Sequence, residues 1–255
     1  MSTAPEPFLT PMIGRLEEMV KDIPGWSPID QLYTLSLLGL ATAHLPGDFV
    51  EIGSWCGRSG VVLGAVARSL GKTQLHCIDL FPSRSDWKQH PDGSYYFEVK
   101  INGEIHRAHQ EQTVWASAFD TQTSRIYLDY DSPLVCFEKQ IQRFGLGQYI
   151  RVYHGNSTTF AASVASDFRC KLAFIDGDHG YDAVCKDIAM VKDRLVGGGW
   201  ICFDDAFSSY EGVNRAIREH ILADPQFDLG QQMTRKLFVA RKKPAPDHSS
   251  GRATA

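Results

Sequence analysis

Four aspartates follow two apolar segments of this 255-residue chain. Asp176 and Asp178 come after KLAFI, and Asp204 and Asp205 come after GWICF. Each apolar segment has the composition of a buried parallel strand. Ligands of open α/β sheets bind beyond the carboxyl ends of such strands, where four bare carboxylates would repel one another. A divalent cation would relieve that repulsion, because hard cations prefer oxygen ligands.

The same aspartates also have purely structural explanations. Asp178 could cap a helix that starts near Gly180, and Asp205 could cap a helix that starts near residue 210. Asp176 could close an Asx-turn. The sequence leaves the metal interpretation and the capping interpretation open.

A glycine-containing turn follows the first expected strand. Gly53 and Gly57 in EIGSWCGRS would let the backbone pass close to a ligand before a helix begins. The spacing does not match the G-x-G-x-x-G fingerprint of dinucleotide binding. Asp79 stands at the end of the second expected strand, where a carboxylate could accept both hydroxyl hydrogens of a ribose.

The elements that must position these residues alternate between strand and helix. The predicted strands are 49–53, 74–79, 149–155, 171–176, 199–205, 227–233 and 236–241, and the predicted helices between them are 57–70, 133–144, 181–195 and 210–222. This order predicts an α/β fold with a Rossmann-like, doubly wound, seven-stranded and mostly parallel sheet. Two N-terminal helices are expected before it, over 8–23 and from Pro28 to about residue 45, the second with Ser27 as its N-cap.

An insertion of about fifty residues interrupts this alternation. Within 82–132, apolar residues alternate and Asn102-Gly103 is a strong hairpin signal, which would place Glu98 opposite Arg107. The hairpin could be a lid over the carboxyl edge of the sheet or a dimerisation arm. The predicted organisation is a helical segment at 1–46, a domain at 47–243 that carries this lid insertion, and a disordered tail at 244–255.

The composition of the chain limits which binding partners and which cellular compartment are expected. The chain has 26 basic and 30 acidic residues and a formal net charge of −4, which gives no footprint for nucleic acid or an anionic membrane. The N-terminus shows no secretory signal, and the longest apolar stretch, 35–45, is too short to span a bilayer. Six cysteines without a C-x-x-C pair suit buried thiols in a reducing, cytoplasmic setting. The hairpin and the N-terminal helices favour a homo-oligomer, a dimer or larger.

Five segments together resemble a known family. They are FVEIGSWCGRSGVVLGAVA, LHCIDLF, HGNS, LAFIDGDHGYDAVCKDI and GGGWICFDD, within 47–81 and 149–206. The chain resembles class I S-adenosylmethionine-dependent methyltransferases, and within them the small bacterial metal-dependent O-methyltransferases of the macrocin and aminocoumarin type, which act on sugars and natural products. The N-terminal helices and the insertion are outside the resemblance.

The resemblance implies roles for particular residues. Mg²⁺ would be bound by Asp176, Asp204 and Asp205, and Asp178 would be the general base, with His179 as the alternative. HGNS departs from the more usual GDS at the adenine side. The residues expected to border S-adenosylmethionine are Glu51, Gly53, Ser54, Ser59, Asp79, Asn156, Ser157 and Asp176.

The leading hypothesis is therefore Mg²⁺-dependent methyl transfer to a hydroxyl of a sugar or a sugar-containing metabolite. The acceptor would be a small molecule or an oligosaccharide. Two alternatives remain: a metal-independent N-methyltransferase, and a non-catalytic scaffold that binds S-adenosylmethionine.

Overall fold

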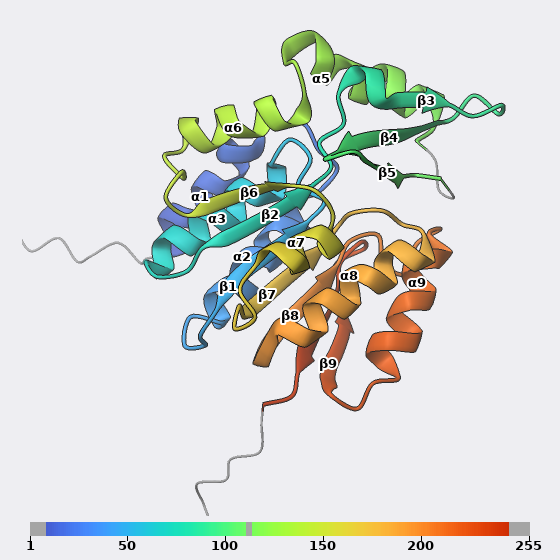
Figure 1. Ribbon diagram of the computed structural model, residues 1–255. Helices are drawn as coiled ribbons and strands as arrows, with labels where there is room; N and C mark the ends of the chain where they lie inside the picture. The colour runs from blue at the N-terminus through green and yellow to red at the C-terminus, as the bar shows by residue number, and fades with distance from the viewer. Residues whose placement is uncertain (1–8, 111–113, 245–255) are drawn as a thin grey trace, which may run out of the picture.

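A seven-stranded sheet with helices packed against both faces forms the centre of the computed structural model, which describes residues 9–110 and 114–244 (Figure 1). The strand order across the sheet is β6-β2-β1-β7-β8-β10-β9. The strands are β1 (Asp48–Ile52), β2 (Leu75–Asp79), β6 (Ile150–His154), β7 (Cys170–Ile175), β8 (Leu195–Phe203), β9 (Phe227–Gln232) and β10 (Phe238–Lys242). The predicted Rossmann-like fold is confirmed.

The register of the sheet brings distant chain segments to one edge. Ile52 at the end of β1 pairs with Ile78 of β2 and Ile175 of β7, and Ile175 pairs in turn with Phe203 of β8. These strands are parallel, so the residues that follow them emerge together at the carboxyl edge. Strand β10 is antiparallel to β8 and to β9, and its first residue, Phe238, lies opposite Phe203.

Two apolar cores flank the sheet because successive residues of each strand face opposite sides. Phe49 of β1 belongs to one core and Val50 to the other. The helices on the Phe49 side are α1 (Leu9–Val20), α2 (Ile29–Ala41), α3 (Arg58–Leu70) and α6 (Pro133–Arg143). The helices on the Val50 side are α7 (Ser157–Ser163), α8 (Tyr181–Arg194) and α9 (Glu211–Ile217).

The insertion folds as a separate small sheet beyond one end of the large one (Figure 1). The predicted hairpin is confirmed: Glu98 lies opposite Arg107, and Arg107 Nε donates to Glu98 Oε1 over 2.7 Å. Trp87, Phe97 and Phe119 are buried in a core of the insertion itself. Its elements are β3 (Trp87–Gln89), β4 (Tyr95–Ile101), β5 (Glu104–Ala108), α4 (Ala116–Ala118) and α5 (Ser124–Asp129), with a 3₁₀ turn (Arg84–Asp86) and a π-helical segment (Phe119–Thr123).

Several sequence-based boundaries differ from the structure. Helix α2 begins at Ile29 with Pro28 as its N-cap and no side-chain cap, so the prediction of a Ser27 cap is wrong. The Ser27 carbonyl instead accepts a hydrogen bond from Arg58 Nε at 3.0 Å, which ties the entry of α2 to α3. The helix expected over 210–222 changes from α9 into a π-helical segment, Arg218–Leu222. Helix α7 was not predicted, and the expected tail lies outside the described residues from 245 onward.

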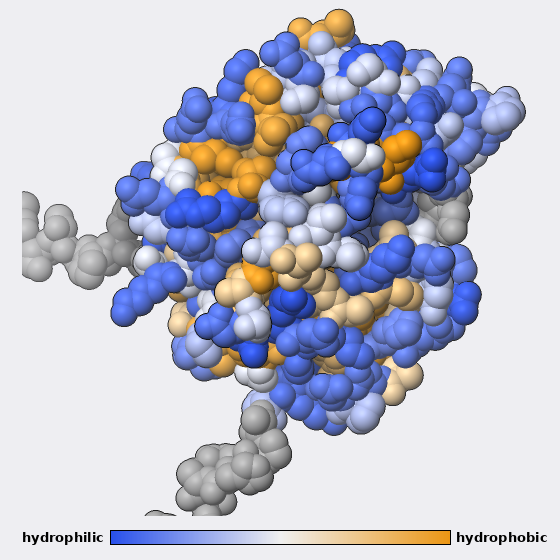
Figure 2. All heavy atoms as spheres, viewed as in Figure 1, coloured by the Kyte–Doolittle hydropathy of each residue, from blue (hydrophilic) through white to orange (hydrophobic). Residues whose placement is uncertain are grey.

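The face of the molecule seen in Figure 2 is mostly polar. Figure 2 shows a largely hydrophilic face, with hydrophobic residues gathered over α6. Within 9–110 and 114–244, none of the helices combines the length and the apolar character that crossing a membrane requires.

The turn after β1 depends on the absence of a side chain at Gly53. Gly53 has φ +91°, and a Cβ built there would lie 2.0 Å from the carbonyl oxygen of Asp176. The turn after β1 and the turn after β7 therefore touch through their backbones. Any larger residue at position 53 must push the two turns apart, because two atoms cannot approach that closely.

Gly53→Ala should destabilise the protein far more than Gly71→Ala. Gly71 also has a positive φ, +76°, but a Cβ there meets nothing within 4 Å. The control variant should lose about 1 kcal/mol from backbone strain, whereas Gly53→Ala adds a steric clash and should lose about 2–4 kcal/mol. Urea unfolding measures both variants. Equal losses would contradict the close approach of the two turns.

Candidate active site

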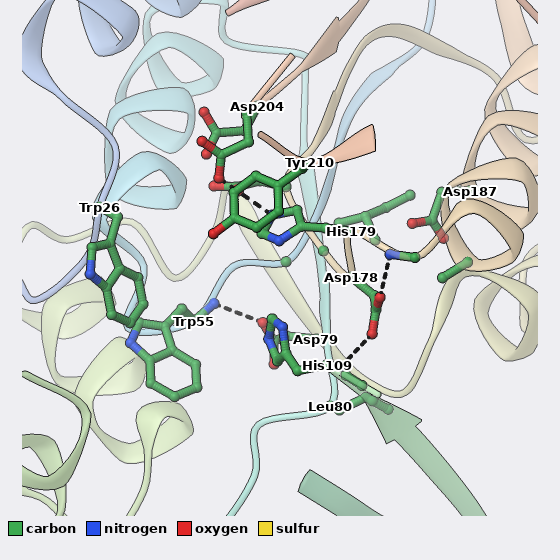
Figure 3. Close-up of a pocket in the computed structure, with 18 of the residues that line it drawn as sticks. Trp26, Trp55, Asp79, Leu80, His109, Asp178, His179, Asp187, Asp204 and Tyr210 are labelled. Atoms are coloured by element: carbon green, nitrogen blue, oxygen red, sulfur yellow. Dashed lines mark hydrogen bonds and ion pairs between the residues drawn. The ribbon is translucent and has the colours of Figure 1, made fainter. Parts of the chain in front are cut away.

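A cavity of about 970 Å³ opens at the carboxyl edge of the sheet. Its walls come from the turns and loops after β1, β2, β6, β7 and β8, from the insertion, and from the turn between β9 and β10. The site residues expected from the sequence that line it are Gly53, Ser54, Ser59, Asp79, Asn156, Ser157, Asp176, Asp178, His179, Asp204 and Asp205. The fold therefore brings these residues together around one space (Figure 3).

Glu51 lies behind the cavity wall. Its side chain is fully buried beneath the glycine turn, and the Cys77 thiol donates to Glu51 Oε2 over 3.4 Å. Burial raises the pKa of Glu51, while nearby groups, the hydroxyls of Ser54 and Ser59 among them, partly oppose that shift. Glu51 is thus placed to support the turn from below.

Asp79 organises the backbone on both sides of the ligand space. Its carboxylate accepts hydrogen bonds from the backbone N–H groups of Trp55, at 2.8 Å, and Phe81, at 2.6 Å (Figure 3 draws the first). Both donors have a positive φ, +47° and +42°, which is costly for bulky residues. Burial raises the pKa of Asp79, and these hydrogen bonds oppose the shift. A carboxylate oxygen accepts more than one hydrogen bond, so Asp79 can still receive ribose hydroxyls.

The loop after β6 carries Asn156 and Ser157. Asn156 caps α7, because its side-chain oxygen accepts from the Thr159 backbone N–H at 2.9 Å. Its side-chain nitrogen lies 3.1 Å from Nδ1 of His106 in the insertion. The Ser157 hydroxyl donates to Asp187 Oδ1 over 2.5 Å. Burial raises the pKa of Asp187 to about 7, so this carboxyl changes charge near neutral pH.

Three carboxylates and one ammonium group lie at the corner where β7, β8 and the start of β10 converge, and the ammonium contacts two of the three. Lys236 Nζ lies 2.9 Å from Asp204 Oδ2 and 3.3 Å from Asp205 Oδ1. The other oxygen of Asp204, Oδ1, is buried and has no hydrogen-bond partner within the described part of the chain. Burial, and then the neighbouring Asp204, raise the pKa values of Asp176 and Asp205. The three acids raise the pKa of Lys236 despite its burial.

The residues at this corner supply the carboxylate oxygens of a cation site, but they are not arranged around an ion. Among the residues that the structure describes, no group of three or more Asp, Glu, His or Cys side chains is arranged to hold a metal ion. Lys236 already contacts two of the three carboxylates. The donors nevertheless suit a hard divalent cation, because they are all carboxylates and Asp204 offers a buried oxygen that has no partner.

Asp178 and His179 have different surroundings. Asp178 accepts backbone hydrogen bonds from His109 at 2.6 Å and Gly180 at 2.7 Å, so it joins the insertion to the start of α8. The His179 ring stacks on Tyr210, with centroids 4.1 Å apart, and its Nε2 lies 3.5 Å from Asp205 Oδ2. Burial lowers the pKa of His179 to about 4, which leaves the imidazole neutral at pH 7. Figure 3 shows the Asp178 carboxylate directed toward His109 and away from Asp204.

Sequence reasoning considered the insertion as a lid but named none of its residues as part of the site, and it missed the contribution of the last hairpin. His106 and His109 of the insertion line the cavity, and so does Lys236. Lys236 could have been found from the topology alone. Phe238 pairs with Phe203 in antiparallel register, so two further residues in each direction place Lys236 opposite Asp205.

Comparison with known proteins gives a family and a set of structures with the same fold. The family model described as "Methyltransferase domain" matches residues 50–206. No curated protein matches the chain in sequence.

The similar solved structures cover most of this chain at low identity. The O-methyltransferase NovP is 15% identical, with a TM-score of 0.61, over 92% of this chain and 98% of NovP. An O-methyltransferase from Bacillus cereus in complex with SAH is 15% identical, with a TM-score of 0.54, over 94% of both chains. CalS11, a calicheamicin methyltransferase also described as a TDP-rhamnose 3′-O-methyltransferase, is 16% identical, with a TM-score of 0.54, over 94% of both chains. At these identities the likeness shows the fold.

Asp187→Asn should stabilise the protein at pH 8 more than at pH 5. The pKa of Asp187 is raised in the folded state, so its favourable contribution is complete below the unfolded pKa of about 4 and is lost as the pH rises through about 7. Asparagine keeps an oxygen for the Ser157 hydroxyl but never ionises. The difference between variant and wild type should grow by about 1–3 kcal/mol from pH 5 to pH 8.

Thermal unfolding at the two pH values measures that difference. Asp193→Asn, which changes an exposed aspartate of the same helix, serves as the control and should give the same difference at both pH values. If Asp187→Asn behaves like this control, Asp187 is not protonated in the folded protein at neutral pH.

Proposed function

The chain belongs to the methyltransferase domain family, whose model matches residues 50–206, and from that premise we propose a specific reaction. The reaction is Mg²⁺-dependent transfer of a methyl group from S-adenosylmethionine to a hydroxyl of a sugar or a sugar-containing metabolite. One observation carries this proposal. The glycine turn and Asp79, which suit the cofactor, line the same cavity as Asp176, Asp204 and Asp205, which suit the cation and the acceptor.

The cofactor would lie along the turn after β1 and the end of β2. Gly53, Ser54 and Ser59 line this part of the cavity. Asp79 would accept the ribose hydroxyls, and Asn156 and Ser157 would border the adenine side. S-adenosylmethionine supplies an electrophilic methyl group when it is bound. The rigid turns fix where that group points, and orientation of this kind can lower a barrier by about 7–11 kcal/mol.

The acceptor would be held at the corner of three carboxylates. Asp176, Asp204 and Asp205 would bind Mg²⁺ through oxygen atoms, among them the buried and unpartnered Oδ1 of Asp204. The bound ion would polarise an acceptor hydroxyl and make its proton easier to remove. Two neighbouring hydroxyls of a sugar are the acceptor groups that such a site would orient best.

Asp178 is the proposed proton acceptor. Its two backbone hydrogen bonds fix the carboxylate at the cavity wall and leave lone pairs for a substrate hydroxyl. His179 is more enclosed, stacked on Tyr210 with its Nε2 3.5 Å from Asp205 Oδ2, so we assign it a packing role beside Asp205.

The acceptor space has features of a binding site for a sugar with an apolar portion. Trp26, Trp115 and Phe207 line the cavity and remain 46%, 66% and 43% exposed. Aromatic faces of this kind pack against the apolar faces of a ring. The name of CalS11, described as a TDP-rhamnose 3′-O-methyltransferase, favours the same class of acceptor.

Removal of divalent cations with EDTA should abolish methyl transfer, and Mg²⁺ should restore it. Asp204→Asn should lower kcat by about two orders of magnitude or more, because one of the ligands that stabilise developing charge is lost. Binding of S-adenosylhomocysteine, measured by calorimetry, should be retained. Asp224→Asn removes another aspartate that pairs with a lysine, outside the cavity, and should leave kcat unchanged.

Full activity in EDTA would contradict the role of the metal. Methylation of an amine acceptor under those conditions would favour the N-methyltransferase alternative. Cofactor binding without any methylated product from a broad panel of acceptors would favour a non-catalytic scaffold.

Asp178→Asn should lower kcat by about 10²- to 10⁴-fold, the range expected when a general base is removed. His179→Gln should have a smaller effect, because its ring contacts Asp205 and is stacked away from the proposed proton path. Single-turnover kinetics of the two variants separate chemistry from binding. A larger loss in His179→Gln, together with a wild-type rate that falls only below about pH 5, would transfer the base role to His179.

A further inference from the structure

The Lys236 ammonium lies against two of the three carboxylates that would hold a cation. Lys236 lies in the turn before β10, and the Ala206 backbone N–H donates to its carbonyl oxygen over 3.0 Å. That hydrogen bond fixes the backbone of Lys236 beside the end of β8. Its side chain is 14% exposed, and its ammonium contacts Asp204 at 2.9 Å and Asp205 at 3.3 Å.

A divalent ion and this ammonium would share the carboxylates of Asp204 and Asp205. Mg²⁺ would approach a carboxylate oxygen to about 2.1 Å, and the Lys236 ammonium already lies 2.9 Å from Asp204 Oδ2. Two positive charges that share one carboxylate repel each other in a site that is largely shielded from water. The Asp204 side chain is 3% exposed, so solvent does little to weaken that repulsion.

The Lys236 ammonium has an alternative hydrogen-bond acceptor nearby. The ammonium is also 3.5 Å from the backbone carbonyl oxygen of Trp26, which lies at the rim of the cavity. A lysine stem has four carbons and rotates freely, so the ammonium can exchange carboxylate partners for this carbonyl and water without moving the backbone.

We propose that Lys236 is an internal competitor for the divalent cation site: its ammonium compensates the carboxylates when no ion is present and must withdraw before an ion can bind to them. This inference rests on the proposed function, because it takes Asp176, Asp204 and Asp205 as the ligands. It adds that a residue outside the ligand set controls the affinity for the ion. It also adds that the Lys236 ammonium compensates the charge of the acids when no ion is bound.

Replacement of the lysine should strengthen metal binding. Mn²⁺ alone is titrated into metal-free protein, and the free ion is followed by electron paramagnetic resonance. Lys236→Met should bind Mn²⁺ about tenfold or more tightly than wild type, because a competing charge at contact distance is removed. Lys186→Gln removes an exposed positive charge from the same cavity wall and should change the affinity by no more than about twofold.

The possible results separate this inference from the proposed function. Equal or weaker binding by Lys236→Met overturns the inference, and so does a lack of binding in both proteins. Binding by Lys236→Met with none by wild type supports the inference but contradicts the Mg²⁺ dependence of the reaction. Tighter binding by both Lys236→Met and Lys186→Gln would mean that general charge, and not competition, controls affinity, and this result overturns it.

A second measurement uses the wild-type protein, in case Lys236→Met does not fold. An amine-specific reagent labels lysines with and without MgCl₂, and mass spectrometry of peptides gives the rate at each position. Labelling of Lys236 should become several-fold faster in Mg²⁺, since the ammonium is released from the acids. Lys186 provides an internal control with a constant rate. An unchanged or slower rate at Lys236 overturns the inference.

Discussion

Repulsion among three carboxylates at one corner of the sheet is the constraint on which the site depends. Asp176 and Asp204 follow adjacent parallel strands, so the fold itself forces them together. Burial raises the pKa of Asp176, and the neighbouring Asp204 raises it further. Such a concentration of negative charge requires positive compensation. Lys236 supplies part of it within the chain, and the unpartnered oxygen of Asp204 shows that compensation is incomplete.

The remaining structure places the proposed cofactor side of the cavity beside that corner. Gly53 lets the turn after β1 rest directly on the turn after β7, which fixes the distance between the cofactor side and the acid side. Asp79 holds the backbone of Trp55 and Phe81 in conformations that neither residue would adopt alone. The insertion forms a further wall of the space, and it contacts Asp178 through the backbone of His109 and Asn156 through the ring of His106. Apart from the contact between Asp79 and Phe81, these contacts join segments distant in sequence, so the geometry is a property of the whole fold.

The sequence predicted the parts of this arrangement that depend on local pattern. Apolar runs that end in acids identified the strands and their carboxyl edge, and Asn102-Gly103 identified the hairpin and its Glu98–Arg107 pair. It could not give the partners of Asp178, because His109 follows the predicted hairpin and no sequence pattern indicates where that segment packs. It also missed Lys236, whose position follows from the antiparallel pairing of β10 with β8 and not from any motif. Whether the insertion is a lid or a dimer arm, and whether the protein is a homo-oligomer, depend on contacts between chains. The expected homo-oligomer stays a prediction.

The central claim is that Asp176, Asp204 and Asp205 together bind a divalent cation next to the methyl donor. Anomalous diffraction from a crystal that contains S-adenosylhomocysteine and Mn²⁺ tests this directly. The account predicts a strong peak about 2.0–2.3 Å from carboxylate oxygens of all three residues, with the cofactor sulfur facing the same space. A crystal with the cofactor in place, no peak at that corner, and Lys236 still paired with Asp204 would contradict it.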